Sequence, residues 1–482
     1  MPHLESPAEP PHVSAPSTLP IVPRLLDTLV VIFGLVALTV LITGGFREWT
    51  PVGRISITSW LRPMLWAIGL FLVRSYFWPG EKLFVRIGRG LRRFMDDDGV
   101  AVLPIFLTTR LGVLLIGFLA VAMIGYADPT GPPWRMYQNE FFNLPARFDA
   151  GWYLGIALRG YEWNPGGQTG QQNIVFFPAM PMLMRYLSLL LARQPLWTGM
   201  LISAVSFLWA LVYLYRLGRQ WVGAERALAG VTLLAAYPFA VFYTAPYTEA
   251  LFLLTAIAAY YHFERDELWQ AGAWGLLCGL TRPNGCMLSI VLALAAVRPL
   301  WQGGWTPVLP PRDGWARFAD RIATAAMPGL GMVAYSVFIF FLTGDPLRWM
   351  KQQVGWGRVY QGLDQLVIDR IELIDTHGLY GYATHWTSDF LYLIAVIFVM
   401  VSIIPVYRRF GLPLAMLLVV NLIPPLLSGG LLSMGRTTSV LFPTFLWLGA
   451  VVPAPHRTAW VFGFGALQGL CAMMFFTWRP IF

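Results

Sequence analysis

Apolar runs long enough to span a bilayer recur along nearly the whole chain, and this feature limits the possible folds more than any other. A membrane-spanning helix needs about 20 consecutive, largely apolar residues. Only 12% of the residues are charged, whereas a soluble domain carries about 25%. So few charges cannot cover a water-exposed surface, and the excess apolar surface has to face lipid. The sequence therefore predicts an all-α fold, a polytopic membrane helical bundle.

Two of the apolar stretches differ from simple spans. Residues 270–298 are interrupted by Arg282-Pro283-Asn284-Gly285, which indicates either a broken span or a tight hairpin. The segment 178–193 follows a long loop and is predicted to lie on the membrane interface. The number of times that these two stretches cross the membrane is open. We therefore expect about 11–14 transmembrane helices in total. The other predicted spans are 25–45, 58–78, 101–125, 198–216, 227–243, 248–263, 323–343, 389–406, 411–428, 437–453 and 459–477.

The net charge of +9 arises from short basic clusters between the apolar runs. Such clusters mark the cytoplasmic ends of membrane helices, so the charge does not indicate nucleic-acid binding. All four clusters become cytoplasmic if 178–193 does not cross the membrane and 270–298 is a hairpin. The long loops 126–197 and 344–388 are then extracytoplasmic. The clusters are Lys82, Arg86, Arg89, Arg92 and Arg93; Arg216, Arg219 and Arg226; Arg312, Arg317 and Arg321; and Arg408 with Arg409.

Three regions are predicted along the chain. Residues 1–24 form a disordered cytoplasmic tail, 25–100 form two extra N-terminal transmembrane helices with a basic cytoplasmic linker, and 101–482 form the transmembrane core. The tail is rich in proline and lacks the basic start of a cleaved signal peptide. The three cysteines lie inside apolar stretches, and their spacing fits neither a disulfide framework nor a metal site.

The first long loop contains the most informative polar residue, Asp149, in the run Arg147-Phe148-Asp149-Ala150-Gly151-Trp152-Tyr153. A carboxylate among aromatic residues at a membrane boundary loses part of its hydration, which suits a general base. Asp149 could instead pair with Arg147 or cap a helix that begins near Ala150. The residues alone leave both roles open.

Other ionisable residues also have a functional and a structural interpretation. Tyr247 and Glu249 lie between two spans and could bind a sugar or an acceptor, or could anchor and cap the helix ends. Arg110 lies inside a span, where it indicates either a functional site or an ion pair with an acid such as Glu249. Arg282 accompanies a break in its helix, and broken helices in membranes usually line a cavity.

Two patterns that could indicate a metal are interpreted otherwise. His377 and His385, with Asp375 and Asp389, lack the spacing of a compact ligand set. Asp96-Asp97-Asp98 contains the Asp-x-Asp pattern of soluble glycosyltransferases, but its cytoplasmic segment of about 20 residues is too short for a nucleotide-binding domain. We interpret these aspartates as counter-charges to the neighbouring basic residues. Neither a metal nor a cofactor is expected.

Five motifs in this sequence resemble those of PIG-V-type mannosyltransferases, also called GPI mannosyltransferase 2, and of their bacterial relatives. The first is RFDAGWYLGIALRGY…NIVFFPAMPMLMR, which begins at Arg147. The others follow in the family's order: Ala245-Pro246-Tyr247-Thr248-Glu249; Gly279-Leu280-Thr281-Arg282-Pro283-Asn284-Gly285; Thr343-Gly344-Asp345-Pro346-Leu347 with Gln352, Trp356 and Arg358; and Arg436 before Val440-Leu441-Phe442-Pro443. Phe148 and Pro283 depart from the family pattern, as do the two extra N-terminal spans.

The resemblance implies a fold of the GT-C superfamily, with catalysis in the first extracytoplasmic loop and a polyprenyl-phosphate sugar as donor. Asp149 would take the proton of the acceptor hydroxyl, and arginines would stabilise the leaving phosphate. A single displacement of this kind inverts the sugar. Mannose as the transferred sugar is implied by the resemblance alone. The residues expected to bind substrate are Arg147, Trp152, Tyr153, Tyr247, Glu249, Arg282, Asn284, Arg358 and Arg436.

The expected partners are a polyprenyl-phosphate sugar donor, membrane lipids, and an acceptor that is a glycan, a lipid or a protein. A multispan transporter or lipid flippase would explain the many spans and the buried arginines equally well, but not the aromatic loop around Asp149. A structural membrane subunit without activity is a third alternative. The expected location is a bacterial inner membrane with the site on its periplasmic or extracellular side; the alternative is the endoplasmic reticulum membrane.

Overall fold

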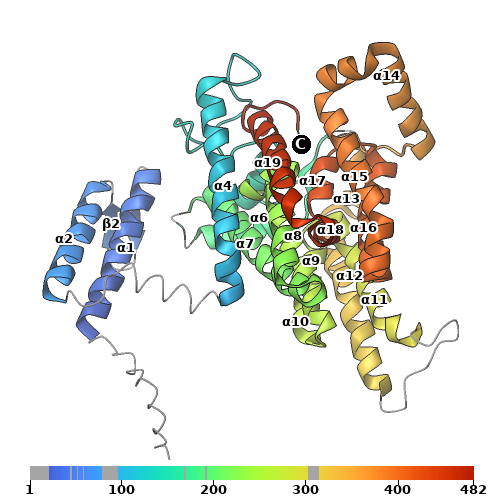
Figure 1. The fold of residues 1–482 in the computed structure, drawn as a ribbon. Helices are drawn as coiled ribbons and strands as arrows, with labels where there is room; N and C mark the ends of the chain where they lie inside the picture. Colours follow the sequence, from blue (N-terminus) through green and yellow to red (C-terminus); the bar gives the residue numbers. More distant parts are fainter. Residues whose placement is uncertain are drawn as a thin grey trace, which may run out of the picture. The chain divides into compact units, whose positions relative to one another are not determined.

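The structure is a computed structural model that describes residues 21–43, 46–50, 53–57, 59–78, 96–167, 170–189, 191, 193–301 and 314–481 (Figure 1). Most of the predicted tail, the basic linker at 79–95 and Arg312 lie outside the described residues. The chain divides into two compact units, Met1–Met95 and Asp96–Phe482.

The first unit contains two helices and a short strand pair. The helix α1 (Ile21–Thr43) packs against α2 (Leu61–Phe77), in agreement with the two N-terminal apolar runs. Between them β1 (Phe46–Thr50) and β2 (Gly53–Ile57) pair antiparallel, with Phe46 opposite Ile57. These strands were not predicted, although Arg54-Ile55-Ser56-Ile57 alternates polar and apolar residues with the period of a strand.

A buried ion pair joins the two helices of the first unit. The Arg74 Nε atom donates to the Asp27 Oδ1 atom at 2.8 Å, and both side chains are almost completely buried. Charged groups inside a membrane protein need such a partner. The pair therefore fixes how α1 and α2 align.

The second unit contains only helices and the loops between them in its described residues, and this confirms the predicted all-α, polytopic helical bundle. Its principal helices are α4 (Asp97–Met123), α5 (Ala150–Arg159), α6 (Ala179–Ser188), α7 (Pro195–Val222), α8 (Ala224–Ala236), η3 (Pro238–Thr244), α9 (Glu249–Glu264), α10 (Leu268–Gly279), η4 (Pro283–Met287), α11 (Leu288–Val297), α12 (Trp315–Thr343), α13 (Arg348–Lys351), η7 (Gln352–Trp356), α14 (Leu363–His385), α15 (Thr387–Phe410), α16 (Leu412–Gly429), α17 (Met434–Ser439), α18 (Phe442–Val451) and α19 (Ala454–Phe476).

Seven helices in the described part of the chain are long and apolar enough to cross a membrane, and the bent pair α8–η3 would make an eighth. This number is lower than the expected count of about 11–14. The difference arises because several apolar runs form short helices, such as α9 with 16 residues and α10 with 12. Hydropathy does not distinguish lipid from protein surroundings, and α9 is buried on all sides by its neighbours.

The segment 270–298 forms a hairpin rather than a broken span. The helix α10 ends at Gly279, and after η4 the chain returns as α11. The Arg298 Nη2 atom, just beyond α11, lies 2.9 Å from the Glu264 Oε2 atom, just before α10. Both ends of the segment therefore lie together, and Arg282 is at its tip. The two glycines Gly279 and Gly331 allow α10 to approach α12 closely, since a Cβ on Gly279 would lie 1.9 Å from the Pro328 carbonyl oxygen.

The helix α8 bends by 77° into η3 at Pro238, which has no N–H to continue the helix. Two distant side chains bind the carbonyl groups at this break. Arg110 in α4 donates to the carbonyl oxygens of Ala235 and Ala240 at 2.9 and 2.5 Å. Gln468 in α19 donates to two carbonyl oxygens in the same turn. Arg110 is therefore a structural residue that stabilises the break.

Ion pairs connect the helix ends on one side of the second unit. They join Asp96 and Asp98 to Arg216 and Arg219, Asp266 to Arg317 and Arg321, Glu264 to Arg298, and Glu225 to Arg457. This is the side that the basic clusters predicted to be cytoplasmic. The opposite ends of α4, α9, α10, α12 and α16 lead into the segments that carry the candidate site residues.

Candidate active site

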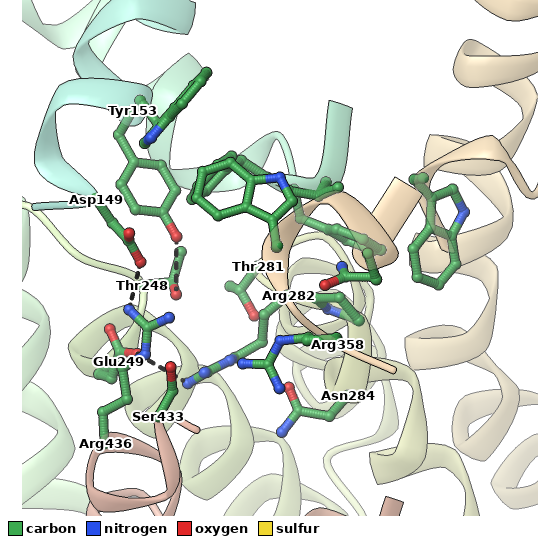
Figure 2. Close-up of a pocket in the computed structure, with 18 of the residues that line it drawn as sticks. Asp149, Tyr153, Thr248, Glu249, Thr281, Arg282, Asn284, Arg358, Ser433 and Arg436 are labelled. Carbon is green, nitrogen blue, oxygen red and sulfur yellow. Dashed lines mark hydrogen bonds and ion pairs between the residues drawn. The ribbon is translucent and has the colours of Figure 1, made fainter. Parts of the chain in front are cut away.

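A large cavity, with a volume of about 1280 Å³, lies where these opposite helix ends meet (Figure 2). Its walls come from α5, the start of α9, the tip of the α10–α11 hairpin, the segment after α12, the end of α16, and α17. Both loops that were expected to be extracytoplasmic contribute to it. The predicted site residues that line the cavity are Asp149, Trp152, Tyr153, Glu249, Arg282, Asn284, Arg358 and Arg436.

Asp149 lies at the start of α5 on a strained turn. Phe148 has a φ of 41°, which residues other than glycine rarely adopt. Its ring packs against those of Phe475 and Trp478, with centroid distances of 5.7 and 4.6 Å. The Asp149 side chain does not cap α5, because it makes no hydrogen bond to the helix N-terminus. Such strain is typical of functional sites, and here it directs the carboxylate into the cavity.

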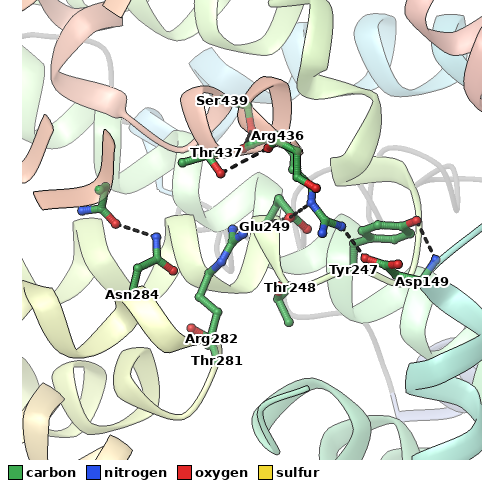
Figure 3. Close-up of polar contacts among 12 residues, drawn as sticks. Asp149, Tyr247, Thr248, Glu249, Thr281, Arg282, Asn284, Arg436, Thr437 and Ser439 are labelled. Carbon is green, nitrogen blue, oxygen red and sulfur yellow. Dashed lines mark hydrogen bonds and ion pairs between the residues drawn. The ribbon is translucent and has the colours of Figure 1, made fainter. Parts of the chain in front are cut away.

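The Asp149 carboxylate is held by Arg436 of α17. The Arg436 Nη1 atom donates to the Asp149 Oδ2 atom at 2.5 Å, and the two side chains are only 14% and 15% exposed (Figure 3). Burial by itself would lower the pKa of Arg436, but the carboxylates of Asp149 and Glu249 raise it above its usual value. The guanidinium therefore remains charged and fixes the orientation of the carboxylate.

Glu249, the first residue of α9, lies between two arginines. Its Oε1 atom is 3.4 Å from the Arg282 Nη1 atom and 3.7 Å from the Arg436 Nε atom, and its side chain is 1% exposed. Within the described residues, the Glu249 Oε2, Arg282 Nη1 and Arg436 Nε atoms are buried and have no hydrogen-bond partner. Unpaired buried polar atoms are costly. The cluster is thus arranged to receive a further polar ligand.

Arg358, which follows η7, completes the cluster. In the part of the chain that the structure describes, its guanidinium has no carboxylate partner and no hydrogen-bond acceptor. Burial, and then the neighbouring guanidinium groups of Arg436 and Arg282, lower the pKa of Arg358 to about 10. Together with Asp149 and Glu249, the three arginines form a cluster with one net positive charge. This charge and the guanidinium geometry favour a phosphate group.

Arg147 and Tyr247, two predicted substrate-binding residues, do not line the cavity. Arg147 is buried, and its Nε atom donates to the Phe476 carbonyl oxygen at 2.7 Å. The Tyr247 hydroxyl accepts from the Asp149 N–H at 3.0 Å and donates to the Arg147 carbonyl oxygen at 3.3 Å. Buried main-chain groups require such partners. The structure therefore does not bring these two predicted residues to the cavity, and both contact main-chain groups instead.

An aromatic wall joins the two long loops. Trp152 stacks on Phe176 with a centroid distance of 5.9 Å, and Trp356 meets Trp152 edge-on at 4.9 Å. Tyr153 meets Phe176 edge-on at 5.0 Å, and its hydroxyl is 3.5 Å from the Thr248 Oγ1 atom. Aromatic rings with polar edges suit a substrate that has apolar and polar faces.

Asn284 and several residues that were not predicted as site residues also line the cavity. The Asn284 Nδ2 atom donates to the Asn421 Oδ1 atom at 2.7 Å, which ties the hairpin tip to α16. Thr248, Ser433 and Trp478 are among the residues that were not selected. Ser433, a polar residue near Arg436 with a φ of 61°, could have been found from its place between two apolar runs. No sequence signal marked Trp478.

The second long loop is mostly helical, and two of the residues considered as metal ligands, His377 and Asp389, make other contacts. The Arg370 Nη2 atom donates to the Asp389 Oδ1 atom at 2.8 Å, and His377 packs edge-on against Trp386. Across the described ranges, no three His, Cys, Asp or Glu side chains are grouped so that they could hold a metal ion.

The fold and the cavity define the class of the molecule: a multispan helical membrane protein with carboxylate and guanidinium groups gathered at its helix ends. A more particular assignment comes from sequence comparison. Residues 134–297 match the family described as Mannosyltransferase (PIG-V). The predicted resemblance to this family is thereby confirmed for the segment that carries Asp149, Glu249 and Arg282.

Mammalian proteins named GPI alpha-1,6-mannosyltransferase 2 are similar to the chain over part of its length. The protein from Cricetulus griseus is 31% identical over 215 residues, which cover 42% of this chain and 42% of that protein. The protein from Rattus norvegicus is 31% identical over 210 residues, which cover 40% and 41%. The chain thus spans less than half the length of these relatives.

Solved structures of the oligosaccharyltransferase from Archaeoglobus fulgidus are also similar, but remotely. The complex with Zn and sulfate has 12% sequence identity and a TM-score of 0.39, over 78% of this chain and 53% of that chain. The complex with an inhibitory peptide and a dolichol-phosphate has 11% identity and a TM-score of 0.40, over 78% and 56%.

Proposed function

We propose that the chain is a GT-C-type membrane glycosyltransferase that transfers a sugar from a polyprenyl-phosphate donor to a hydroxyl group of an acceptor. Mannose is proposed as the sugar because of the match to the PIG-V family over residues 134–297. The observation that carries the proposal is the gathering of Asp149 and three arginines, Arg282, Arg358 and Arg436, in one cavity. Fold similarity alone would not suffice, because the same fold can host different functions.

Asp149 is the proposed general base. Its Oδ2 atom is held by Arg436, whereas its Oδ1 atom has no hydrogen-bond donor among the described residues and is open to an acceptor hydroxyl. The hydroxyl oxygen attacks the anomeric carbon as its proton passes to Asp149. The bond from that carbon to the phosphate oxygen breaks, and its electron pair stays on the phosphate. Attack and departure on opposite faces invert the sugar. A positioned base contributes about 10²–10⁴-fold to the rate.

Arg282, Arg358 and Arg436 are proposed to bind the donor phosphate. A phosphodiester carries one negative charge, which the single net positive charge of the cluster formed by these arginines with Asp149 and Glu249 balances. When the sugar departs, the phosphate becomes a monoester with a charge of about −1.5 to −2. The arginines therefore interact more strongly with the leaving group than with the donor, which is the differential binding that catalysis requires. Arg358 has no competing carboxylate partner among the described residues, so it is the arginine most available to the phosphate.

The polyprenyl chain is proposed to enter beside α12 and α16. Both helices are long and apolar enough to cross a membrane. Their residues Met332, Val420 and Pro424, and the nearby Leu432, form an apolar part of the cavity lining. A lipid chain between these helices would place its phosphate next to Arg358 without burying the phosphate in the bilayer.

The proposed orientation has the ion-paired helix ends in the cytoplasm and the cavity outside. The basic clusters at 216–226 and 408–409 lie on the former side, as the positive-inside rule requires. For a bacterial inner membrane the cavity would open to the periplasm or exterior; in an endoplasmic reticulum membrane it would open to the lumen. Residues 101–482 are the proposed catalytic core, and 25–100 an addition to it.

The proposal is tested with purified protein, radiolabelled polyprenyl-phosphate mannose and membrane lipids as acceptors. We expect labelled product with inverted anomeric configuration, and its loss in Asp149→Asn while the protein remains folded. Asp128→Asn is the matched control, because Asp128 is an exposed carboxylate of the same loop whose side chain binds Thr130 and no other residue among those described. Movement of the intact lipid across vesicles without cleavage of the sugar would instead indicate a flippase and overturn the proposal.

A further inference from the structure

A second, smaller cavity of about 390 Å³ adjoins the first and is bounded by α5 and by residues 162–164 and 171–173; we call it the side chamber. Its volume lies within the range of small-molecule sites. We propose that the side chamber binds a neutral carbohydrate unit of the acceptor, an inference that rests on the proposed transferase function.

The side chamber is continuous with the site at Asp149. Gly151, Gly155 and Arg159 line both cavities and are spaced by four residues, so they share one face of α5. The two glycines keep this face open: a Cβ on Gly151 would lie 3.1 Å from Trp134, and one on Gly155 3.2 Å from the Arg159 guanidinium. From Asp149 to Gly155 the helix rises roughly 9 Å. An acceptor can therefore extend along α5 from the base into the side chamber.

The walls of the side chamber are preorganised. The Gln172 side chain accepts from the Asn164 N–H at 3.0 Å and donates to the Asn164 and Gly167 carbonyl oxygens. The Asn173 side chain accepts from the Glu162 N–H at 3.1 Å. The second long loop braces this wall, because the Trp356 Nε1 atom donates to the Gln172 carbonyl oxygen at 3.3 Å. A wall built in this way has little entropy to lose when a ligand binds.

The polar groups that remain point to hydroxyl groups as ligands. In the described part of the chain, the Gln171 amide, the Asn164 Nδ2 atom and the Trp163 Nε1 atom have no hydrogen-bond partner. An amide both donates and accepts, as a sugar hydroxyl does. The charges of Arg159 and Glu162, 3.4 Å apart, offset one another. The side chamber is thus neutral overall, whereas the arginine cluster in the larger cavity is positive. A neutral carbohydrate therefore suits the side chamber, and a phosphate suits the cluster.

The first test is kinetic. Octyl α-D-mannopyranoside and octyl glycosides of glucose, galactose and N-acetylglucosamine are offered as acceptors, with an N-acetylated serine tripeptide amide as the alternative. In Gln171→Leu and Asn164→Leu we expect the KM for the best octyl glycoside to rise about tenfold or more, the effect of one or two lost hydrogen bonds, while the KM for the donor stays within about twofold. Gln365→Leu, which removes an exposed amide in α14, is the control.

An unchanged acceptor KM in both variants, or preferred use of the peptide, would overturn the inference and leave the transferase proposal intact. The second test does not need transfer. Saturation-transfer NMR with methyl α-D-mannopyranoside and the other methyl glycosides should show binding to the wild-type protein that both variants weaken. Absence of binding to the wild type, or equal binding to the variants, would also overturn the inference. If glycoside binding depends on Gln171 but the protein shows no transferase activity, the side chamber is supported as a carbohydrate site. Only the proposed transferase function is then contradicted.

Discussion

The Arg436 guanidinium contacts the Asp149 carboxylate at 2.5 Å, although 287 positions separate the two residues in the sequence. One residue belongs to the first long loop and the other to the short α17 helix near the end of the chain. Glu249, at the start of α9, lies within 4 Å of Arg436 and of Arg282 as well. The candidate site is therefore a network of charges from four segments, and each charge depends on the others.

Removing the shared cation should reduce both stability and transfer. In Arg436→Gln, the Asp149 and Glu249 carboxylates lose their partner, and breaking a buried ion pair costs about 3–5 kcal/mol. We expect a lower melting temperature in detergent and no transfer. The double variant Asp149→Asn, Arg436→Gln should regain much of the melting temperature without transfer, because it leaves no unpaired Asp149 charge. An unchanged melting temperature in Arg436→Gln would contradict this account.

Arg358→Gln should have the opposite effect on stability. Arg358 has no partner to lose among the described residues, and its charge lies beside two other cations. We expect an unchanged or higher melting temperature, but a donor KM raised about 10–100-fold, since a hydrogen bond to a charged group contributes about 1.5–3 kcal/mol. A normal donor KM would remove Arg358 from the proposed phosphate site.

Donor binding should also depend on pH through Arg358. The pKa of this guanidinium is lowered to about 10, and only its protonated form attracts phosphate. Affinity for the polyprenyl-phosphate sugar, whose phosphodiester keeps one negative charge over this range, should therefore be constant near neutral pH and fall as the pH rises through about 10. Equilibrium binding between pH 7 and pH 11 checks this. The loss of donor affinity at alkaline pH should be smaller in Arg358→Gln than in the wild type. An equal loss in both proteins would show that another group is responsible for it.

Arg110→Gln is expected to lower stability rather than chemistry. Arg110 binds the carbonyl oxygens of Ala235 and Ala240 and the Thr244 hydroxyl at the break between α8 and η3. Unsatisfied buried acceptors cost about 1–3 kcal/mol each, so unfolding should become easier by about 3 kcal/mol or more. The kcat of the protein that remains folded should be close to normal. Arg185→Gln, which changes an exposed arginine, provides the comparison. Lost kcat with normal stability would instead indicate the functional role that the sequence left open for Arg110.

Cysteine labelling tests the proposed orientation. In a Cys286→Ser background, where Cys278 and Cys471 are buried, Thr130→Cys and Arg409→Cys each introduce an exposed thiol at opposite ends of the second unit. A membrane-impermeant maleimide should label position 130 in intact cells, and position 409 only after permeabilisation. The reverse pattern would place the cavity in the cytoplasm and exclude a donor that is presented on the outer face.

Much of the fold and of the site was accessible from sequence because the relevant signals are local. Apolar runs of spanning length predicted the helical bundle, and the hydropathy of each run depends only on its own residues. The motif around Asp149 and the Arg-Pro-Asn-Gly break identified residues that the structure brings into one cavity. The count of spans was less accessible, because α9 and α10 are shorter than a spanning helix and α9 is apolar although its neighbours bury it.

By itself, the sequence determined a membrane-embedded helical protein, which residues are chemically able to act, and on which side of the bundle the basic clusters gather. Only the tertiary structure decided that 270–298 is a hairpin with Arg282 at its tip, that Arg436 rather than Arg147 pairs with Asp149, and that the Tyr247 hydroxyl binds the main chain of the Asp149 turn. The reason is physical. Hydropathy and helix breaks are set by neighbouring residues, whereas the partner of a charge is set by where the chain returns, and that depends on the packing of all the helices together.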